Sequence, residues 1–166
     1  MTLSTHAVAG AAIGGLLAYN PALVVITAFA SHFVLDAIPH WDYEVKVSNE
    51  SNDLLNAKIQ LDKKFFKDSI KILIDVLIGV LVIGALFYSH TPYVRLMALV
   101  GAGFAVLPDF LQFVYYRTHS RILRPLQDFH VNFMHAKKSL SNRPFLGPFI
   151  QIIIVLILSL IVIRFI

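Results

Sequence analysis

Five long apolar segments alternate with polar stretches along the chain. They cover residues 3–19, 21–38, 69–89, 93–116 and 145–165. A helix that crosses a membrane needs about 20 mostly apolar residues, and long apolar runs favour helices over strands. The pattern therefore predicts an all-α polytopic bundle with about five transmembrane helices. Tight turns at 20–21 and 90–92 and two longer polar loops would join them.

The first two segments also carry packing and capping signals. Gly10 and Gly14 form a small-xxx-small face, which lets membrane helices approach one another closely. Pro21 suits the first turn of the second helix. Pro39 should end that helix, because residues before a proline avoid the helical region.

A shorter amphipathic pattern lies between the last two apolar segments, over residues 121–138. Its apolar residues recur at helical spacing among arginines and lysines: Ile122, Leu126, Phe129, Phe133 and Met134. A helix with one apolar and one basic face lies in the plane of a membrane surface. The spacing predicts an interfacial helix here, next to the bundle.

Composition supports the membrane interpretation and narrows the chemistry. The 166 residues are 57% hydrophobic and 14% charged, whereas soluble domains are about 25% charged. There is no cysteine, which excludes thiolate metal sites, cysteine nucleophiles and disulfides. Imidazole and carboxylate ligands remain, and these suit zinc, manganese, iron or magnesium. The basic residues form no groove-reading motif, so no nucleic-acid partner is expected.

The basic residues are distributed unevenly between the two predicted sides. Eleven of the 14 Lys and Arg fall in the loops 41–68 and 117–144, which five spans would place on the same side as the N-terminus. The positive-inside rule puts that side in the cytoplasm. The chain is therefore predicted to be an integral membrane protein whose N-terminus and large loops are cytoplasmic.

Candidate ligands are densest where the second segment ends. His32 and Asp36 lie four residues apart, a spacing that puts both side chains on one face of a helix and lets both hold one metal ion. His40 and Asp42 follow just beyond Pro39. The alternative is structural, because a histidine near a helix end and an aspartate near a proline often only shape a turn.

Other ionisable residues favour a metal site. His6, Asp75 and Asp109 lie in three further apolar segments, at a similar predicted depth and on the same side. Ionisable residues inside a membrane are costly and mark functional sites. We expect these side chains to meet His32 and Asp36 and to hold divalent ions. The alternatives are a His–Asp hydrogen-bond network without metal and, for Asp75, an ion pair with Lys71 four residues earlier.

Two histidines of the predicted interfacial helix, His130 and His135, are five residues apart and do not share one face. Either could reach the site from the membrane surface or remain exposed. His40, Asp42 and His130 are the candidate catalytic residues.

Four short motifs carry a resemblance to a known family. They are Thr5-His6-x-x-x-Gly10, Ser31-His32-x-x-x-Asp36-x-x-Pro39-His40-Trp41-Asp42, Leu107-Pro108-Asp109 and Asp128-Phe129-His130. The pattern resembles small bacterial membrane-bound metal-dependent hydrolases, a group placed with the zinc-dependent phospholipase C and single-strand nuclease superfamily. The resemblance implies an all-helical fold with one to three zinc ions in a bacterial inner membrane. It implies these ligands: His6, His32, Asp36, Asp75, Asp109 and either His130 or His135.

These observations lead to one functional hypothesis and two alternatives. The hypothesis is a metal-dependent hydrolase of a lipid or lipid-linked phosphoester, in which Asp42 or Asp75 orients water and the basic interfacial helix attracts anionic headgroups. A metal-ion or proton transporter would also use buried His and Asp residues. A non-catalytic scaffold would use them only to fix helix packing.

Overall fold

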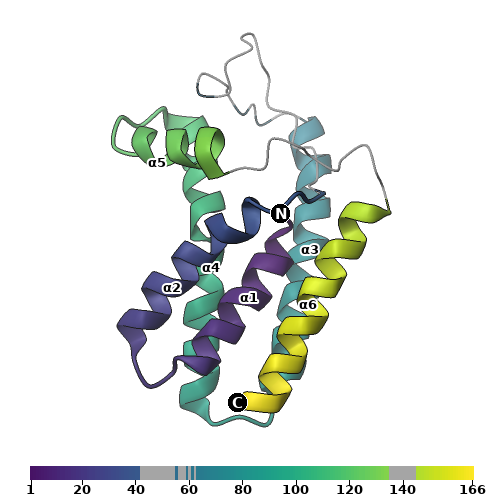
Figure 1. The fold of residues 1–166 in the computed structure, drawn as a ribbon. Coiled ribbons are helices and arrows are strands. Elements are labelled where there is room, and N and C mark those ends of the chain that lie inside the picture. The colour runs from purple at the N-terminus through teal and green to yellow at the C-terminus, as the bar shows by residue number, and fades with distance from the viewer. Residues whose placement is uncertain (42–54, 56–58, 60, 62, 135–144) are drawn as a thin grey trace.

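The computed structural model describes residues 1–41, 55, 59, 61, 63–134 and 145–166, and in these ranges the chain is helical without strands (Figure 1). The helices are α1 (Leu3–Leu16), α2 (Pro21–Asp36), α3 (Lys63–Phe87), α4 (Pro92–Thr118), α5 (Arg124–Phe129), the π-helical turn η2 (His130–Met134) and α6 (Leu146–Phe165). The predicted all-α class is confirmed.

Helices α2 and α4 begin in the same way, with a polar N-cap followed by a proline. The side-chain oxygen of Asn20 accepts a hydrogen bond from the backbone N–H of Leu23, and Pro21 occupies the first turn. Thr91 accepts from the N–H of Val94 in the same way, again followed by a proline. A polar cap satisfies an amide that the helix leaves unpaired, and the proline is already set for helical φ.

Helix α1 lies at the centre of the bundle and contacts α2, α3, α4 and α6. Its closest neighbour is α4, because a Cβ added at Gly10 would overlap the carbonyl of Gly101, and one added at Gly14 would overlap that of Met97. Only glycine lets the two backbones come this close. The close packing predicted from Gly10 and Gly14 is confirmed.

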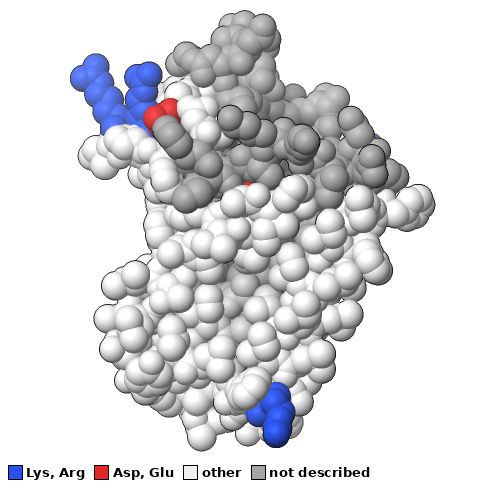
Figure 2. Space-filling model, viewed as in Figure 1, with Lys and Arg blue, Asp and Glu red and all other residues white. Residues whose placement is uncertain are grey.

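Three helices are long and apolar enough to cross a membrane: Phe65–Phe87, Pro92–Thr118 and Leu146–Phe165. The predicted count of five is not confirmed, because the other two apolar helices end at Leu16 and Asp36. Their 14 and 16 residues span roughly 21 and 24 Å, whereas the hydrocarbon core is about 30 Å thick. Figure 2 shows one face of the molecule. The lower half of this face carries basic side chains only at its bottom edge, and the rest of that half is uncharged.

Different termini and turns lie at the two ends of the bundle. The N-terminus, the end of α2 and helix α5 lie toward one end, where α3 and α4 extend beyond the two short helices (Figure 1). The α1–α2 turn, the α3–α4 turn and the C-terminus lie at the other. The five-segment pattern predicts the N-terminus and the turns 20–21 and 90–92 at opposite ends, as found here, whereas much of the loops 41–68 and 117–144 lies outside the described residues.

The predicted helix over 121–138 is shorter and less regular in the structure. Residues 121–123 form a turn, α5 starts at Arg124, and the chain continues as a π-helical turn to Met134. Residues 135–138 lie outside the described part. Ile122 is 89% exposed and Phe129 39%, and exposed arginines flank Ile122, so this segment keeps the mixed apolar and basic surface of an interfacial element.

Candidate metal centre

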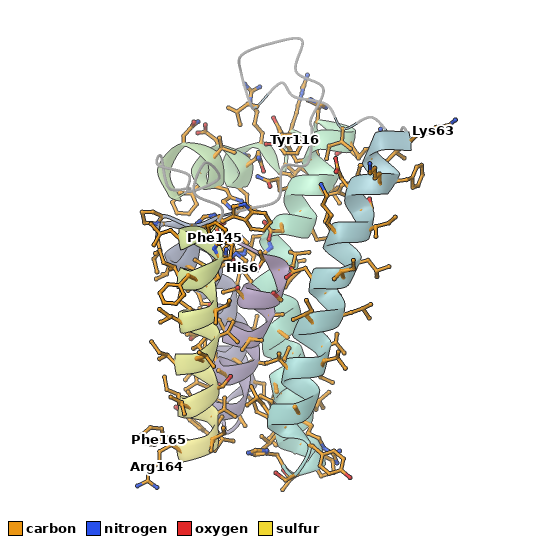
Figure 3. The ribbon with its side chains drawn as sticks, turned by 90° about the vertical axis from the view of Figure 1, so that its right-hand side faces the viewer. His6, Lys63, Tyr116, Phe145, Arg164 and Phe165 are labelled. Atoms are coloured by element: carbon orange, nitrogen blue, oxygen red, sulfur yellow. The ribbon has the colours of Figure 1, made fainter. Side chains whose placement is uncertain are left out.

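Four side chains from α2, α4 and the π-helical turn meet at one end of the bundle. Each of His32, Asp36, Asp109 and His130 offers one ligand atom, and these atoms all lie within 4.8 Å of one another. His32, Asp36 and His130 are buried, and Asp109 is 26% exposed. Figure 3 places the neighbouring His6 inside the bundle, near the level of Phe145 at the start of α6.

The Oδ2 atom of Asp36 forms one side of this group. It lies 3.3 Å from Nε2 of His32 and 2.9 Å from Nε2 of His130. The two imidazole nitrogens are 3.3 Å apart, and Oδ1 of Asp109 is 3.6 Å from Nε2 of His32. Each of these atoms can donate a lone pair toward a common point.

A backbone carbonyl of α4 fixes the orientation of the His32 ring. Its Nδ1 lies 2.9 Å from the carbonyl oxygen of Ala105, and because a carbonyl only accepts, Nδ1 carries the proton and donates. Its Nε2 is then the atom that faces the carboxylates. Pro108 follows in α4, where its missing N–H removes the helical hydrogen bond to the carbonyl of Phe104, the residue before Ala105. A backbone carbonyl on the far nitrogen is the usual support of a metal-binding histidine.

His130 enters from the first residue of the π-helical turn η2. Its ring packs edge-on against His32 and Phe33, with centroids 4.9 and 5.4 Å away. The two ring contacts set the imidazole plane, while the widened turn directs Nε2 toward Asp36. Single π turns inside helices occur often at functional sites.

The Oδ1 atom of Asp36 faces a different set of partners. It accepts from the Met1 amine at 2.7 Å and lies 3.1 Å from Nε2 of His6. The amine is also 2.8 Å from Nε2 of His40, whose Nδ1 donates to the carbonyl of Ile38 at 2.7 Å. His6 stacks on His32, with centroids 4.1 Å apart. Asp36 therefore joins the four-ligand group on one side to His6 and His40 on the other.

Some of the distances within the group suit a small divalent ion, whereas the 2.9 Å between Nε2 of His130 and Oδ2 of Asp36 is a hydrogen-bond distance and the ligand atoms are only within 4.8 Å of one another overall. Bonds of about 2.0–2.2 Å in a tetrahedral arrangement separate ligand atoms by roughly 3.3–3.6 Å. The separations of 3.3 Å between Nε2 of His32 and Oδ2 of Asp36, and of 3.6 Å to Oδ1 of Asp109, fall in this range. Two imidazoles and two carboxylates form a donor set that suits zinc, iron or manganese.

The predicted site residues divide into three groups. The structure brings together His32, Asp36, Asp109 and His130, with His6 and His40 beside them. Asp42 and His135 lie outside the described residues. Asp75 is placed elsewhere: its carboxylate accepts hydrogen bonds from the Ser4 backbone N–H at 2.9 Å and from the Ser4 hydroxyl. Lys71, the alternative partner of Asp75, pairs instead with Asp68 at 2.9 Å.

One residue that supports the site was not among those predicted from the sequence. Gln151 of α6 is buried and accepts from the Thr2 N–H at 2.9 Å, while its amide donates to the Trp41 carbonyl at 2.8 Å. It thereby ties α6 to the start of α1 and to the chain just after the end of α2. Its position could have indicated this role, because Gln151 is a polar residue near the site end of the segment, whereas Ser159 and Arg164 lie toward the other end.

Comparison of the chain with protein-family models, with curated proteins and with solved structures found no match. The resemblance drawn from the four motifs therefore remains a prediction. What the structure adds is geometric: a His/Asp cluster that could hold a metal ion.

Proposed function

We propose that this protein is a metal-dependent membrane hydrolase that cleaves a phosphoester of a lipid or lipid-linked substrate. The observation that carries the proposal is the convergence of four ligand atoms from three separate elements at one end of a membrane-type bundle. A divalent ion bound there would supply a Lewis acid for a phosphoryl oxygen and lower the pKa of water. Zinc is the first candidate, because both imidazole and carboxylate ligands suit it.

Within the proposal, the chain's own residues hold the ion and keep the ligands aligned. His32, Asp36, Asp109 and His130 are the ligands. Asp109 is the most exposed of the four, which favours its side for the approach of a substrate. His6 and His40 position Asp36 through its second oxygen, and an outer layer of this kind typically changes metal affinity by about 10- to 100-fold.

The surroundings favour a lipid substrate over a soluble one. The cluster lies at the bundle end that carries α5 and η2 (Figure 1), where exposed Ile122 and Phe129 neighbour exposed Arg121 and Arg124. Apolar side chains would enter the acyl boundary there, and the arginines would attract anionic headgroups. The distribution of Lys and Arg favours the cytoplasmic leaflet for this end.

The first experiment measures metal. Purified protein is dialysed and its zinc, manganese and iron are counted by elemental mass spectrometry, in the wild type and in the His32→Ala and His130→Ala variants. His90→Ala is the matched control, because His90 lies in the turn between α3 and α4, at the other end of the bundle. We expect metal in the wild type and control, and loss from both ligand variants. Equal metal in all four proteins would overturn the proposal.

The second experiment tests the reaction itself. Protein in detergent micelles is mixed with phosphatidic acid or phosphatidylglycerol, and released phosphate or glycerol phosphate is measured with and without a chelator. We expect release that stops on chelation and is absent from His32→Ala. If metal-loaded protein cleaved neither lipid phosphoester, the metal centre would stand but the proposed hydrolase activity would be overturned.

A further inference from the structure

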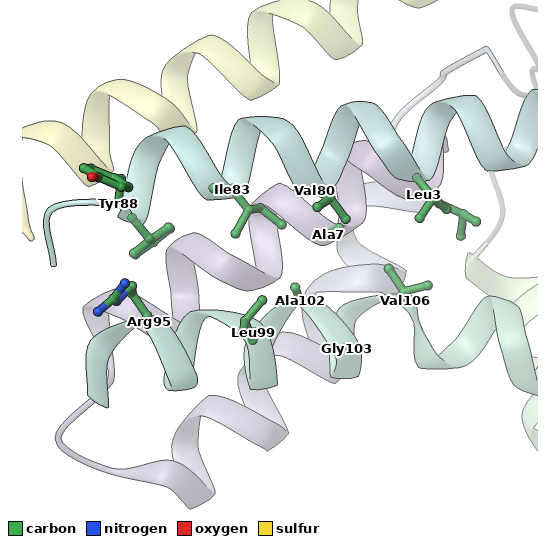
Figure 4. A pocket seen from close by; sticks show the side chains of 13 residues that line it. Leu3, Ala7, Val80, Ile83, Tyr88, Arg95, Leu99, Ala102, Gly103 and Val106 are labelled. Carbon is green, nitrogen blue, oxygen red and sulfur yellow. The ribbon is translucent and has the colours of Figure 1, made fainter. Parts of the chain in front are cut away.

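An apolar groove of about 530 Å³ runs between α3 and α4, and α1 forms its floor (Figure 4). Leu3 and Ala7 of α1 line its base, with Val80 and Leu99 on its two walls. Helices α3 and α4 contact each other far less than each contacts α1. Both belong to the helices long enough to cross a membrane, so the groove lies where acyl chains would surround the protein.

Two glycines keep the groove open. A Cβ added at Gly84 of α3 or at Gly103 of α4 would meet no atom within 4 Å, and both residues line the groove. Neither glycine is therefore explained by close helix packing, in contrast to Gly10 and Gly101. The volume lies in the range of small-molecule sites, about 300–1,000 Å³.

One end of the groove carries a positive charge. Arg95 lines it together with Tyr88, at the end opposite Leu3 and Val106 (Figure 4). The sequence has no Asp or Glu between residues 76 and 108, and no ion pair among the described residues includes Arg95. The cation is therefore available to a ligand at the mouth of an otherwise apolar channel.

We propose that this groove binds one anionic phospholipid, with its phosphate on Arg95 and an acyl chain along α4 toward Val106. Those two positions are eleven residues apart along the helix, a length of roughly 16 Å, which suits a linear hydrocarbon chain. A guanidinium binds phosphate through two parallel hydrogen bonds. The phosphate end of the groove lies toward the bundle end opposite the candidate metal centre, and the proposal does not depend on hydrolysis.

The experiment uses native mass spectrometry of the full chain, delipidated in detergent and titrated with phosphatidylglycerol or phosphatidylcholine. The wild type should bind one phosphatidylglycerol, about fivefold more tightly than phosphatidylcholine, the value of one basic residue near an anionic surface. Arg95→Gln should remove this preference, and its control Arg164→Gln should keep it. Gly103→Leu and Gly84→Leu should lose binding of both lipids.

Ala85→Leu controls for the larger side chain, because Ala85 is exposed on α3 beside Gly84 and does not line the groove. Leucine forms helices better than glycine does, so the groove variants should fold, which circular dichroism checks. Undiminished lipid binding by Gly103→Leu would overturn the proposal. So would equal binding of both lipids by the wild type, or a dimer that Gly103→Leu dissociates, because the groove would then hold a second copy.

Discussion

Two carboxylates near the same end of the bundle, Asp36, which is buried, and Asp75, which is half-buried, have opposite surroundings. Asp36 faces imidazole nitrogens of four histidines within 3.8 Å, together with the Met1 amine. Asp75 accepts from the backbone N–H and the hydroxyl of Ser4. Both aspartates interrupt apolar segments in much the same way, so the sequence alone does not separate them.

The difference shows what makes a carboxylate a ligand. Asp75 meets groups that already carry protons, and it satisfies an amide of the first turn of α1, which no residue of that helix can satisfy. Asp36 shares its space with nitrogen lone pairs, beginning with Nε2 of His32, whose proton is held on the other nitrogen by Ala105. Lone pairs that face a carboxylate repel it unless a proton or a cation lies between them. The Met1 amine fills this role at Oδ1, and a divalent ion would fill it at Oδ2. Asp36 is therefore the metal candidate, and Asp75 is a helix cap from a neighbouring helix.

Replacing Asp36 by asparagine should have the largest effect on metal binding. The amide keeps the size of the side chain and removes its negative charge, so we expect zinc affinity to fall by at least about 100-fold, the upper range for losing even an outer-layer partner. Competition with a chromophoric chelator measures this. Asp75→Asn is the matched control and should bind zinc like the wild type. Equal losses in the two variants would mean that the two carboxylates do not differ as described.

Changing Pro108 to alanine should have an intermediate effect. Alanine restores an N–H that can bond to the carbonyl of Phe104 and removes the ring that crowds it, which shifts the adjacent Ala105 carbonyl that orients His32. We expect zinc affinity to fall by about tenfold, as for other supports of a metal-binding histidine. The same chelator competition measures the change, and Ala98→Gly, on the buried face of α4, controls for altered helix packing. An unchanged zinc affinity would mean that the Ala105 carbonyl does not support metal binding.

Much of the fold could be predicted from hydrophobic length and turn chemistry. The apolar segments, the Asn20-Pro21 and Thr91-Pro92 starts and the Gly10 and Gly14 packing all depend on local spacing. The number of membrane crossings could not be predicted in this way. Helices α1 and α2 end a few residues early, which leaves them shorter than the hydrocarbon core.

The candidate site could be predicted in part for a related reason. Depth along each segment groups His32, Asp36 and Asp109, since residues at one depth of a bundle can meet. The depth of a residue along its helix does not tell which way its side chain points. The sequence therefore groups Asp75 with the three ligands, although its carboxylate accepts from Ser4. Backbone groups such as the Ala105 carbonyl have no sequence signature beyond the nearby proline.

The Asp75 variant should leave metal binding intact and reduce stability. Asp75→Asn keeps one acceptor oxygen but loses the charge in its bonds to Ser4, so we expect unfolding in detergent to become easier by about 1 kcal/mol. Asp68→Asn is the control, because its partner Lys71 is exposed and such pairs contribute about 0–1 kcal/mol. Thermal unfolding with zinc present and absent separates the two roles. If Asp75→Asn lost stability only when zinc was present, its carboxylate would be acting through the metal, and the contrast with Asp36 would fail.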